Sequence, residues 1–255
     1  LTVAQVGGRP IIIKADKPIR SPKDDTLGRT RLAQLFAEEV MLLDASEGVV
    51  VGVLGPWGSG KTSFLNLLRT YLKDIGIEVL DFNPWVFSGT DQLVESFFIE
   101  LSAQLKLHPD LLELGKALEN YGELFSGMGS LPLVGPWIEG ARTTTKIIAR
   151  IVQRRKEGIG GLRIKVEKAL LKLEKPLVVF VDDIDRLTTS EIRDIFKLVR
   201  LTANFPNVIY VVAFDRFRVE EALTEQGLPG RDYLEKILQI SVDLPAIPAH
   251  ILNKQ

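Results

Sequence analysis

Short apolar runs alternate along the chain with longer segments in which apolar residues recur every three or four positions. The runs are rich in Val and Ile and are bounded by Gly, Pro, Asn or Asp, which is typical of buried strands. The longer segments have the period of an α-helix. The predicted strands cover 49–54, 77–82, 176–183, 208–215 and 239–245, and the predicted helices cover 62–75, 91–106, 188–201, 217–226 and 231–238.

This alternation predicts the domain organisation. Strands that alternate with helices favour an α/β fold with a parallel sheet covered on both faces. Between residues 108 and 175 the pattern changes to a Gly/Pro-rich stretch and then a long basic, helical stretch. We expect residues 1–107 and 176–255 to form one core, with 108–175 as a mostly helical insertion, because a compact core needs only a short connection there.

Composition narrows the function classes. The chain has 255 residues, 45% of them hydrophobic and 25% charged, as in an ordinary globular domain. The absence of cysteine excludes disulfides and thiolate metal sites, and two distant histidines disfavour a zinc site or a histidine-based triad. No apolar run reaches the length of a transmembrane helix, so we expect a cytoplasmic protein. A net charge of -1 gives no overall attraction to nucleic acid or anionic lipid.

The segment "GPWGSGKTS" at residues 55–63 carries the clearest chemistry, because it follows a predicted buried strand and opens a predicted helix. Its spacing fits a phosphate-binding loop, in which glycines let backbone N–H groups approach phosphates and the helix N-terminus favours anions. Lys61 would reach the β- and γ-phosphates, and the Thr62 hydroxyl would bind Mg²⁺. The predicted nucleotide-binding residues here are Gly55, Trp57, Gly58, Ser59, Gly60, Lys61, Thr62 and Ser63.

Two residues of this loop are unusual. Pro56 has no N–H to donate, but it precedes the part of the loop whose amides would bind phosphate. Trp57 has three interpretations, namely local packing, a contact with the nucleotide, or a contact with a partner.

Adjacent carboxylates follow the apolar run of "VVFVDDIDRL" at residues 178–187. Carboxylates at the end of a buried strand are costly without a cation or polar partner. We assign Asp182 to the metal and Asp183 to the attacking water, which favours hydrolysis over transfer to another substrate. The alternative is that both cap a helix. For Asp185 and Arg186, a cap or an ion pair is as good an interpretation as a functional role.

The next predicted strand ends in the same way, with Asp215 and Arg216. In a sheet ordered 5-1-4-3-2, this strand lies between the phosphate-loop strand and the acidic one. Arg216 would then emerge beside the γ-phosphate as a sensor or charge-stabilising group. A local salt bridge or cap is the alternative for both residues.

On these motifs the chain resembles the KAP family of phosphate-loop NTPases, in the AAA+/STAND-like group. The resemblance spans nearly the whole sequence apart from 108–175. "FNPW" at residues 82–85 and "DDIDRL" at 182–187 are the more discriminating pair, whereas the loop itself, the Walker A motif, is generic. The other matching segments are 16–19, 24–29, 55–63, 211–216 and 232–245.

The resemblance implies a three-layer αβα fold around five parallel strands in the order 5-1-4-3-2, with Walker B at 178–187. It implies ATP and Mg²⁺ as ligands, ATP being preferred to GTP, and places Asn83 and Trp85 on the catalytic side. Core packing is the alternative for Trp85. It also implies adenine contacts near Pro18, Leu27, Gly28 and Arg29. Proteins of this group usually carry a C-terminal helical lid, which we expect to be missing after Gln255, so turnover in isolation would be slow.

Many family members insert membrane-spanning helices before the acidic strand, whereas this chain has a basic segment there. Residues 141–175 contain 11 Lys or Arg and 3 Asp or Glu, a local charge of +8. Arg142, Lys146, Arg150 and Arg154 recur every four residues, as on one face of a helix. Such a face can bind an anionic membrane or nucleic acid, and a simple solvated face is the alternative.

These features favour a Mg²⁺-dependent ATPase that acts as a conformational switch or motor within a larger protein. The alternative is an ATP-gated scaffold or assembly module with little turnover. A small-molecule kinase is a third interpretation, but the sequence shows no acceptor site. Homo-oligomerisation and peripheral attachment to a membrane are the candidate interactions.

Overall fold

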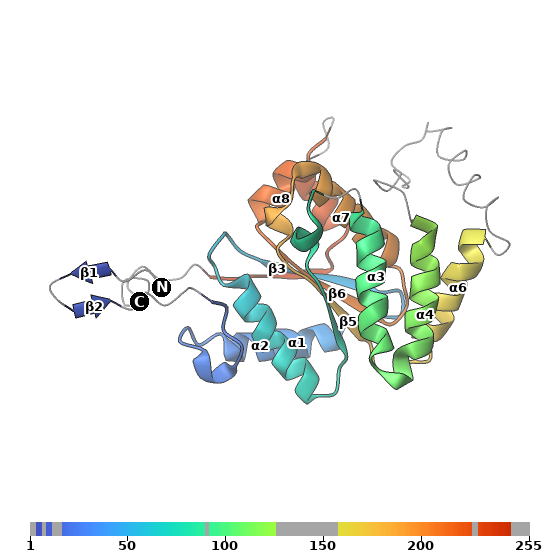
Figure 1. Cartoon of the computed structure of the whole chain (residues 1–255), viewed down its shortest axis with the longest axis horizontal. Helices are drawn as coiled ribbons and strands as arrows, with labels where there is room; N and C mark the ends of the chain where they lie inside the picture. The colour runs from blue at the N-terminus through green and yellow to red at the C-terminus, as the bar shows by residue number, and fades with distance from the viewer. Residues whose placement is uncertain are drawn as a thin grey trace.

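The computed structural model describes the backbone of residues 4–6 and 9–11 and the segments 17–89, 92–125, 158–225 and 229–245. The first two stretches, β1 (Ala4–Val6) and β2 (Arg9–Ile11), pair as antiparallel strands. The remaining described segments build a sheet with helices on both of its faces (Figure 1).

The central sheet has five parallel strands in the order β4-β5-β6-β3-β7. Read from the β7 edge and numbered along the chain, this is the order 5-1-4-3-2, so the predicted topology is confirmed. Every residue of β3, β5 and β6 is buried, which explains their uninterrupted apolar sequences. The five strands are β3 (Val49–Leu54), β4 (Val79–Phe82), β5 (Leu177–Val181), β6 (Val208–Phe214) and β7 (Ile240–Asp243).

Alternate residues of the strands point into two separate hydrophobic cores, one on each face of the sheet. Val51 and Val53 pack under α1 (Thr30–Met41) and α2 (Lys61–Asp74). The opposite face, which includes Val50, lies under six helices, and Figure 1 shows the two layers. These helices are α3 (Leu93–Lys106), α4 (Leu112–Gly122), α6 (Gly158–Leu170), α7 (Thr189–Thr202), α8 (Arg216–Leu223) and α9 (Gly230–Glu235). The three-layer αβα fold is therefore confirmed.

Short 3-10 helices shape the connections. Two of them, η2 (Pro84–Phe87) and η5 (Ile184–Arg186), directly follow the carboxyl ends of β4 and β5. The others are η1 (Pro22–Asp24), η3 (Pro109–Leu111) and η4 (Glu123–Phe125).

The two ends of the 108–175 segment are helical and share the main core. In α4, Tyr121 packs edge-on against Phe98 of α3 and Phe205, with ring centroids 5.5 and 5.7 Å apart. The part that carries Arg142, Lys146, Arg150 and Arg154 lies outside the described residues. The assignment of 108–175 as an insertion therefore stays a prediction.

Several basic side chains at the C-terminal end of this segment have partners within the protein. Arg163 pairs with Glu167, and its guanidinium lies 5.0 Å from the ring centroid of Phe205. Lys175 donates to the carbonyl of Ile75 at 2.7 Å. At this end of the segment, part of the excess positive charge is used in structural contacts.

We predict that replacing Leu170 in α6 by Ala lowers the free energy of unfolding by about 2–5 kcal/mol, because the side chain is 2% exposed and its removal leaves a cavity. The neighbouring Leu171, 66% exposed, is the matched control, and Leu171→Ala should change stability by less than about 0.5 kcal/mol. Urea unfolding of both variants measures the difference. Equal, small effects would show that α6 is not part of the cooperative core.

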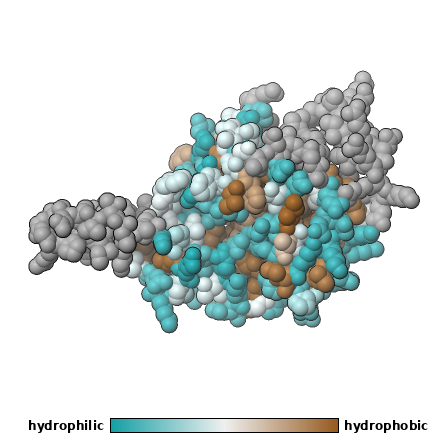
Figure 2. All heavy atoms as spheres, in the orientation of Figure 1, coloured by the Kyte–Doolittle hydropathy of each residue, from teal (hydrophilic) through white to brown (hydrophobic). Residues whose placement is uncertain are grey.

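In the part of the chain that the structure describes, no helix is long and apolar enough to cross a membrane. Figure 2, in the orientation of Figure 1, shows apolar residues as separate spots among polar ones on this face.

Candidate functional site

The sheet brings the predicted site residues to one edge. β4, β5, β6 and β3 are four consecutive parallel strands of the sheet, so their carboxyl ends lie on the same side. The loop 55–60 leaves β3 there, and 182–186 leaves β5, which is separated from β3 by β6 alone. Segments far apart in the sequence therefore form one cluster of charged groups.

The loop 55–60 has the backbone of an anion cradle. Gly58 and Gly60 have φ angles of 77° and 83°, a left-handed conformation that side chains disfavour. A Cβ at Gly60 would also lie 2.9 Å from the Arg29 guanidinium. Gly60 is the N-cap of α2 and offers no side chain to cap it, so the first amides of α2 are left for another acceptor. The Ser59 hydroxyl oxygen is buried and has no hydrogen-bond partner among the described residues. A bound phosphate group would fit these donors.

Arg29 holds the backbone of this loop by a hydrogen bond. Its guanidinium is buried and donates to the carbonyl oxygens of Ser59 and, at 2.7 Å, of Pro245. Burial lowers the pKa of Arg29 from its ordinary value, an effect opposed by the nearby Asp25 carboxylate. The structure thus places Arg29 against the loop backbone, with Gly28 just before it at a φ of 67°. A contact of either residue with adenine stays a prediction.

Lys61 is held in an ion pair within the protein. Its ammonium nitrogen lies 2.9 Å from the Asp185 carboxylate, and it also donates to the carbonyls of Gly55 and Pro56 at 3.0 and 3.3 Å. Both side chains are buried, 10% and 6% exposed. A phosphate that binds Lys61 must therefore compete with Asp185.

Asp182 and Thr62, the residues predicted to hold Mg²⁺, are neighbours. Burial raises the pKa of the Asp182 carboxyl from its ordinary value, and a hydrogen bond with the Thr62 side chain partly opposes this. A hydroxyl beside one carboxylate suits Mg²⁺, which keeps several waters and takes further oxygens from substrate phosphates. No group of three His, Asp or Glu that could hold a metal occurs within the described segments.

The raised pKa of Asp182 predicts a pH dependence of stability. The folded protein favours the protonated carboxyl, so this stabilisation is complete below the pKa of the unfolded chain and is lost as pH rises through the folded pKa. In the absence of nucleotide, Asp182→Asn should therefore gain free energy of unfolding relative to wild type as pH rises from about 4 to 7. Urea unfolding across this range, with exposed Asp110→Asn as the control, measures the gain. Parallel curves for all three proteins would contradict the assignment.

Asp183 is fixed by two donors and an unusual backbone. Its φ of 58° lies in the left-handed region, which Asp tolerates better than most residues. One carboxylate oxygen accepts from the Asn83 amide and the other from the Arg186 guanidinium, both at 2.8 Å. Asn83 follows β4 and Arg186 follows β5, so two loops of the sheet edge meet at this carboxylate.

Two tryptophans lie beside the ion pair of Arg186 with Asp183. The Arg186 guanidinium carbon lies 5.0 Å from the ring centroid of Trp57 and 4.8 Å from that of Trp85. Trp57 is 71% exposed, so packing in the core does not account for it.

Arg216 begins α8 at the end of β6, beside the loop strand β3. Its guanidinium lies 3.7 Å from Glu220 and 3.8 Å from Asp243. Asp215 caps α8 by accepting from the amide of Arg218 at 3.3 Å. The structure thus shows the local contacts expected as the alternative for both residues, and a catalytic role for Arg216 stays a prediction.

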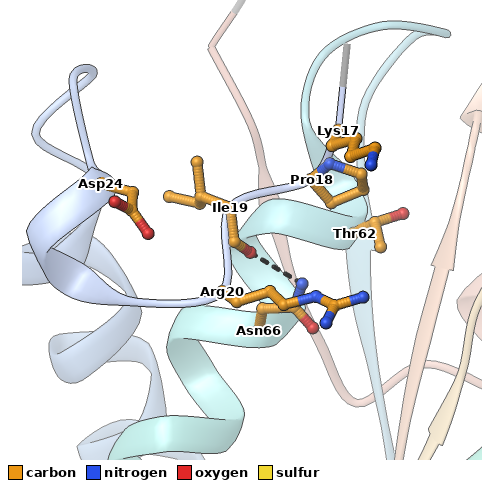
Figure 3. A pocket seen from close by; sticks show the side chains of 7 residues that line it. All are labelled: Lys17, Pro18, Ile19, Arg20, Asp24, Thr62 and Asn66. Atoms are coloured by element: carbon orange, nitrogen blue, oxygen red, sulfur yellow. Dashed lines mark hydrogen bonds between the residues drawn. The ribbon is translucent and has the colours of Figure 1, made fainter. Parts of the chain in front are cut away.

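A pocket of about 680 Å³ opens beside Thr62, between the start of α2 and the segment 17–24 (Figure 3). This volume is in the range of small-ligand sites. Ile19 is fastened to α2 at one wall: its N–H donates to the Ser63 hydroxyl at 3.3 Å and its carbonyl accepts from Asn66 at 2.8 Å. The full lining is Lys17, Pro18, Ile19, Arg20, Asp24, Thr62 and Asn66.

Sequence reasoning missed the partner of Lys61 and part of this pocket. Asp185 lies three residues after Asp182, so its position beside the loop depends on the turn at η5, which spacing alone does not define. Asn66 lies one helical turn after Thr62 in α2, and this spacing could have placed both on one face. Pro18 lines the pocket, and its predicted contact with adenine stays a prediction.

Comparison with known proteins gives the following matches. The model of the KAP family P-loop domain matches residues 29–254. The phage T7 exclusion protein of Escherichia coli (strain K12) is 28% identical over 272 residues, covering 94% of this chain and 36% of that protein. The phosphonates import ATP-binding protein PhnC 1 of Cupriavidus necator is 47% identical over 49 residues, 18% of each chain.

Among solved structures, the Aeropyrum pernix ORC2 protein in its ADPNP–ADP complexes is similar, with a TM-score of 0.48 and 12% identity over 94% of this chain and 54% of that chain. The chain therefore spans about a third of the exclusion protein and about half of the ORC2 chain.

Proposed function

Since the chain belongs to the KAP family of P-loop NTPases, we propose that it binds ATP with Mg²⁺ and hydrolyses it as a conformational switch or motor of a larger protein. The observation that carries the proposal is the convergence of three groups at one sheet edge. These are the loop before α2, the Thr62–Asp182 pair, and Asp183 on its two donors.

In this proposal the loop amides and the N-terminus of α2 receive the phosphates, with Lys61 on the β- and γ-phosphates. The free amides and the glycine conformations support this role. Thr62 and Asp182 would hold Mg²⁺, which neutralises charge on the phosphates when bound. The remaining loop residues, Gly55, Trp57, Gly58, Ser59 and Ser63, form the surrounding walls.

Asp183 would act as the base. It takes a proton from a water whose oxygen attacks the γ-phosphorus, while the bond between that phosphorus and the β–γ bridging oxygen breaks. The products are ADP and inorganic phosphate. Arg216 would stabilise charge at the γ-phosphate after leaving its pairs with Glu220 and Asp243, which at 3.7 and 3.8 Å are long.

The pocket beside Thr62 would take the nucleoside. It adjoins the start of α2, and Pro18 and Ile19 supply the apolar surface that a base requires. Gly28 and Arg29 would support this region through the loop. We propose that this site prefers ATP to GTP.

A switching role is supported by the pairing of both key charges within the protein. Lys61 is neutralised by Asp185, and both oxygens of Asp183 have donors. Binding of phosphates to Lys61 would release Asp185 and so change the pairing at this edge. The second candidate function, an ATP-gated assembly module with little turnover, uses the same pairs without hydrolysis. Both the ATP-hydrolysing switch and the assembly module are compatible with self-association, or with binding of an anionic membrane or nucleic acid through 141–175. The relative named for phage T7 exclusion adds a role in phage exclusion as a further proposal.

The direct test is to measure ATP binding by calorimetry and phosphate release by the purified chain with Mg²⁺, with GTP as competitor. Mg²⁺-dependent release of phosphate, inhibited little by GTP, is the expected result. Tight binding without release would favour the assembly module, and no binding of either nucleotide would refute both.

A further inference from the structure

The arrangement of Arg186 is not explained by nucleotide binding or by packing. Its guanidinium nitrogen Nε lies 2.8 Å from Asp183, while its carbon lies within 5.0 Å of two indole rings. The rings come from different parts of the sheet edge, Trp57 from the loop after β3 and Trp85 from η2 after β4. Arg186 therefore links both of these segments to the proposed base.

Trp57 and Trp85 both lie at the surface. They are 71% and 49% exposed, whereas most aromatic rings of the described protein lie in the two cores. The face of an indole ring attracts a guanidinium, so each of the two rings can hold the Arg186 side chain. What the two tryptophans share is their contact with Arg186.

The guanidinium in turn restricts the Asp183 carboxylate. With Arg186 on one oxygen and Asn83 on the other, the carboxylate is held in one orientation. Arg is suited to this because its planar group can stack on rings while its N–H groups donate at the edge. A lysine in its place would keep the charge and lose the stack.

We propose that Arg186 is a positioning residue for Asp183, and that Trp57 and Trp85 hold it in place by stacking. This rests on the proposed hydrolysis, because it concerns the base of that reaction. Trp57 directly precedes Gly58 in the loop that would bind phosphate, so occupation of the loop changes the support of Arg186. In this way the stack transmits the state of the loop to the base.

The test separates binding from turnover in the purified chain with ATP and Mg²⁺. Arg186→Gln should lower kcat at least tenfold and leave the dissociation constant of ATP within about threefold. Arg186→Lys should restore only part of kcat. Trp57→Leu and Trp85→Leu should each lower kcat severalfold. Trp57→Phe should retain most of the kcat that Trp57→Leu loses. In an Arg186→Gln background, neither Leu variant should reduce kcat further. Phe217→Leu, which alters an exposed aromatic residue of α8, is the matched control and should have no effect.

A readout that does not depend on turnover uses the indole rings themselves. In a Trp137→Phe background only Trp57 and Trp85 remain, since the chain has three tryptophans. In the absence of nucleotide, Arg186→Gln should shift or intensify the fluorescence emission of these two tryptophans. Urea unfolding shows whether the variant is folded. ATP should change the emission of the wild-type stack.

The outcomes distinguish the two proposals. Wild-type turnover together with unchanged kcat in Arg186→Gln, or tryptophan effects that persist without Arg186, would overturn the positioning role and leave the ATPase intact. Absence of ATP binding by the wild type would overturn the ATPase and the positioning role together. Loss of kcat with retained affinity and the non-additive cycle would support both.

Discussion

Asp183→Asn should reduce ATP turnover by about 10²–10⁴-fold, the usual contribution of a general base, while ATP binding changes only a few-fold. The amide has the size of the carboxylate and tolerates the left-handed backbone at this position. It can still contact Asn83, but it cannot accept a proton from water. The measurement is phosphate release under single-turnover conditions, with affinity from calorimetry.

Asp194→Asn is the matched control for this variant. Asp194 is 15% exposed, close to the 17% of Asp183, and it is also ion-paired, with Lys197 at 3.1 Å. It lies on α7 rather than among the loops of the sheet edge. Equal turnover in wild type and Asp183→Asn would refute the role of Asp183, and equal losses in both variants would point to a general electrostatic effect.

Lys61→Ala should lower ATP affinity at least about 100-fold, because a charge-assisted hydrogen bond to a phosphate contributes up to about 3 kcal/mol and two phosphates are involved. It should also destabilise the protein without nucleotide by about 3–5 kcal/mol, since Asp185 is left as a buried carboxylate without its cation. Calorimetry and urea unfolding measure the two effects separately.

A double variant distinguishes these two consequences. Lys61→Ala with Asp185→Asn removes both charges, so it should recover most of the stability but none of the affinity. Asp185→Asn alone frees Lys61 from its partner and should bind ATP at least as tightly as wild type. Weak binding by Asp185→Asn would instead show that Asp185 belongs to the nucleotide site. Lys73→Ala, in the last turn of the same helix, is the control for a lysine away from the edge.

The order of the five strands was predictable from the resemblance to the KAP family. The strands, the helices and their layers were predictable because apolar runs and helical periods differ clearly in this sequence. The motif at 55–63 also located the loop, since its glycines are required by the backbone that the structure shows at Gly58 and Gly60. These features depend on local chemistry, which a sequence displays directly.

The side-chain partners at the edge were not predictable in the same way. The contact of Lys61 with Asp185 and that of Arg186 with two tryptophans join residues more than 100 positions apart. Such pairs depend on how η2 and η5 turn after their strands, and short turns have no periodic signal. The alternatives open for Arg186 and Trp57 in the sequence could therefore be narrowed only in three dimensions.

Arg29 gives the phosphate loop a mechanical connection to the chain that follows the neighbouring edge strand, β7. The Arg29 guanidinium donates hydrogen bonds to the carbonyl oxygens of Ser59 and Pro245, so it bridges the loop and the chain leaving β7. A force on the polypeptide after β7 would act through the planar guanidinium on the backbone of Ser59. Ser59 directly precedes Gly60 and the start of α2. Force applied to the chain after β7 is thus delivered to the loop through the Arg29 side chain, in addition to the direct pairing of β7 with β3.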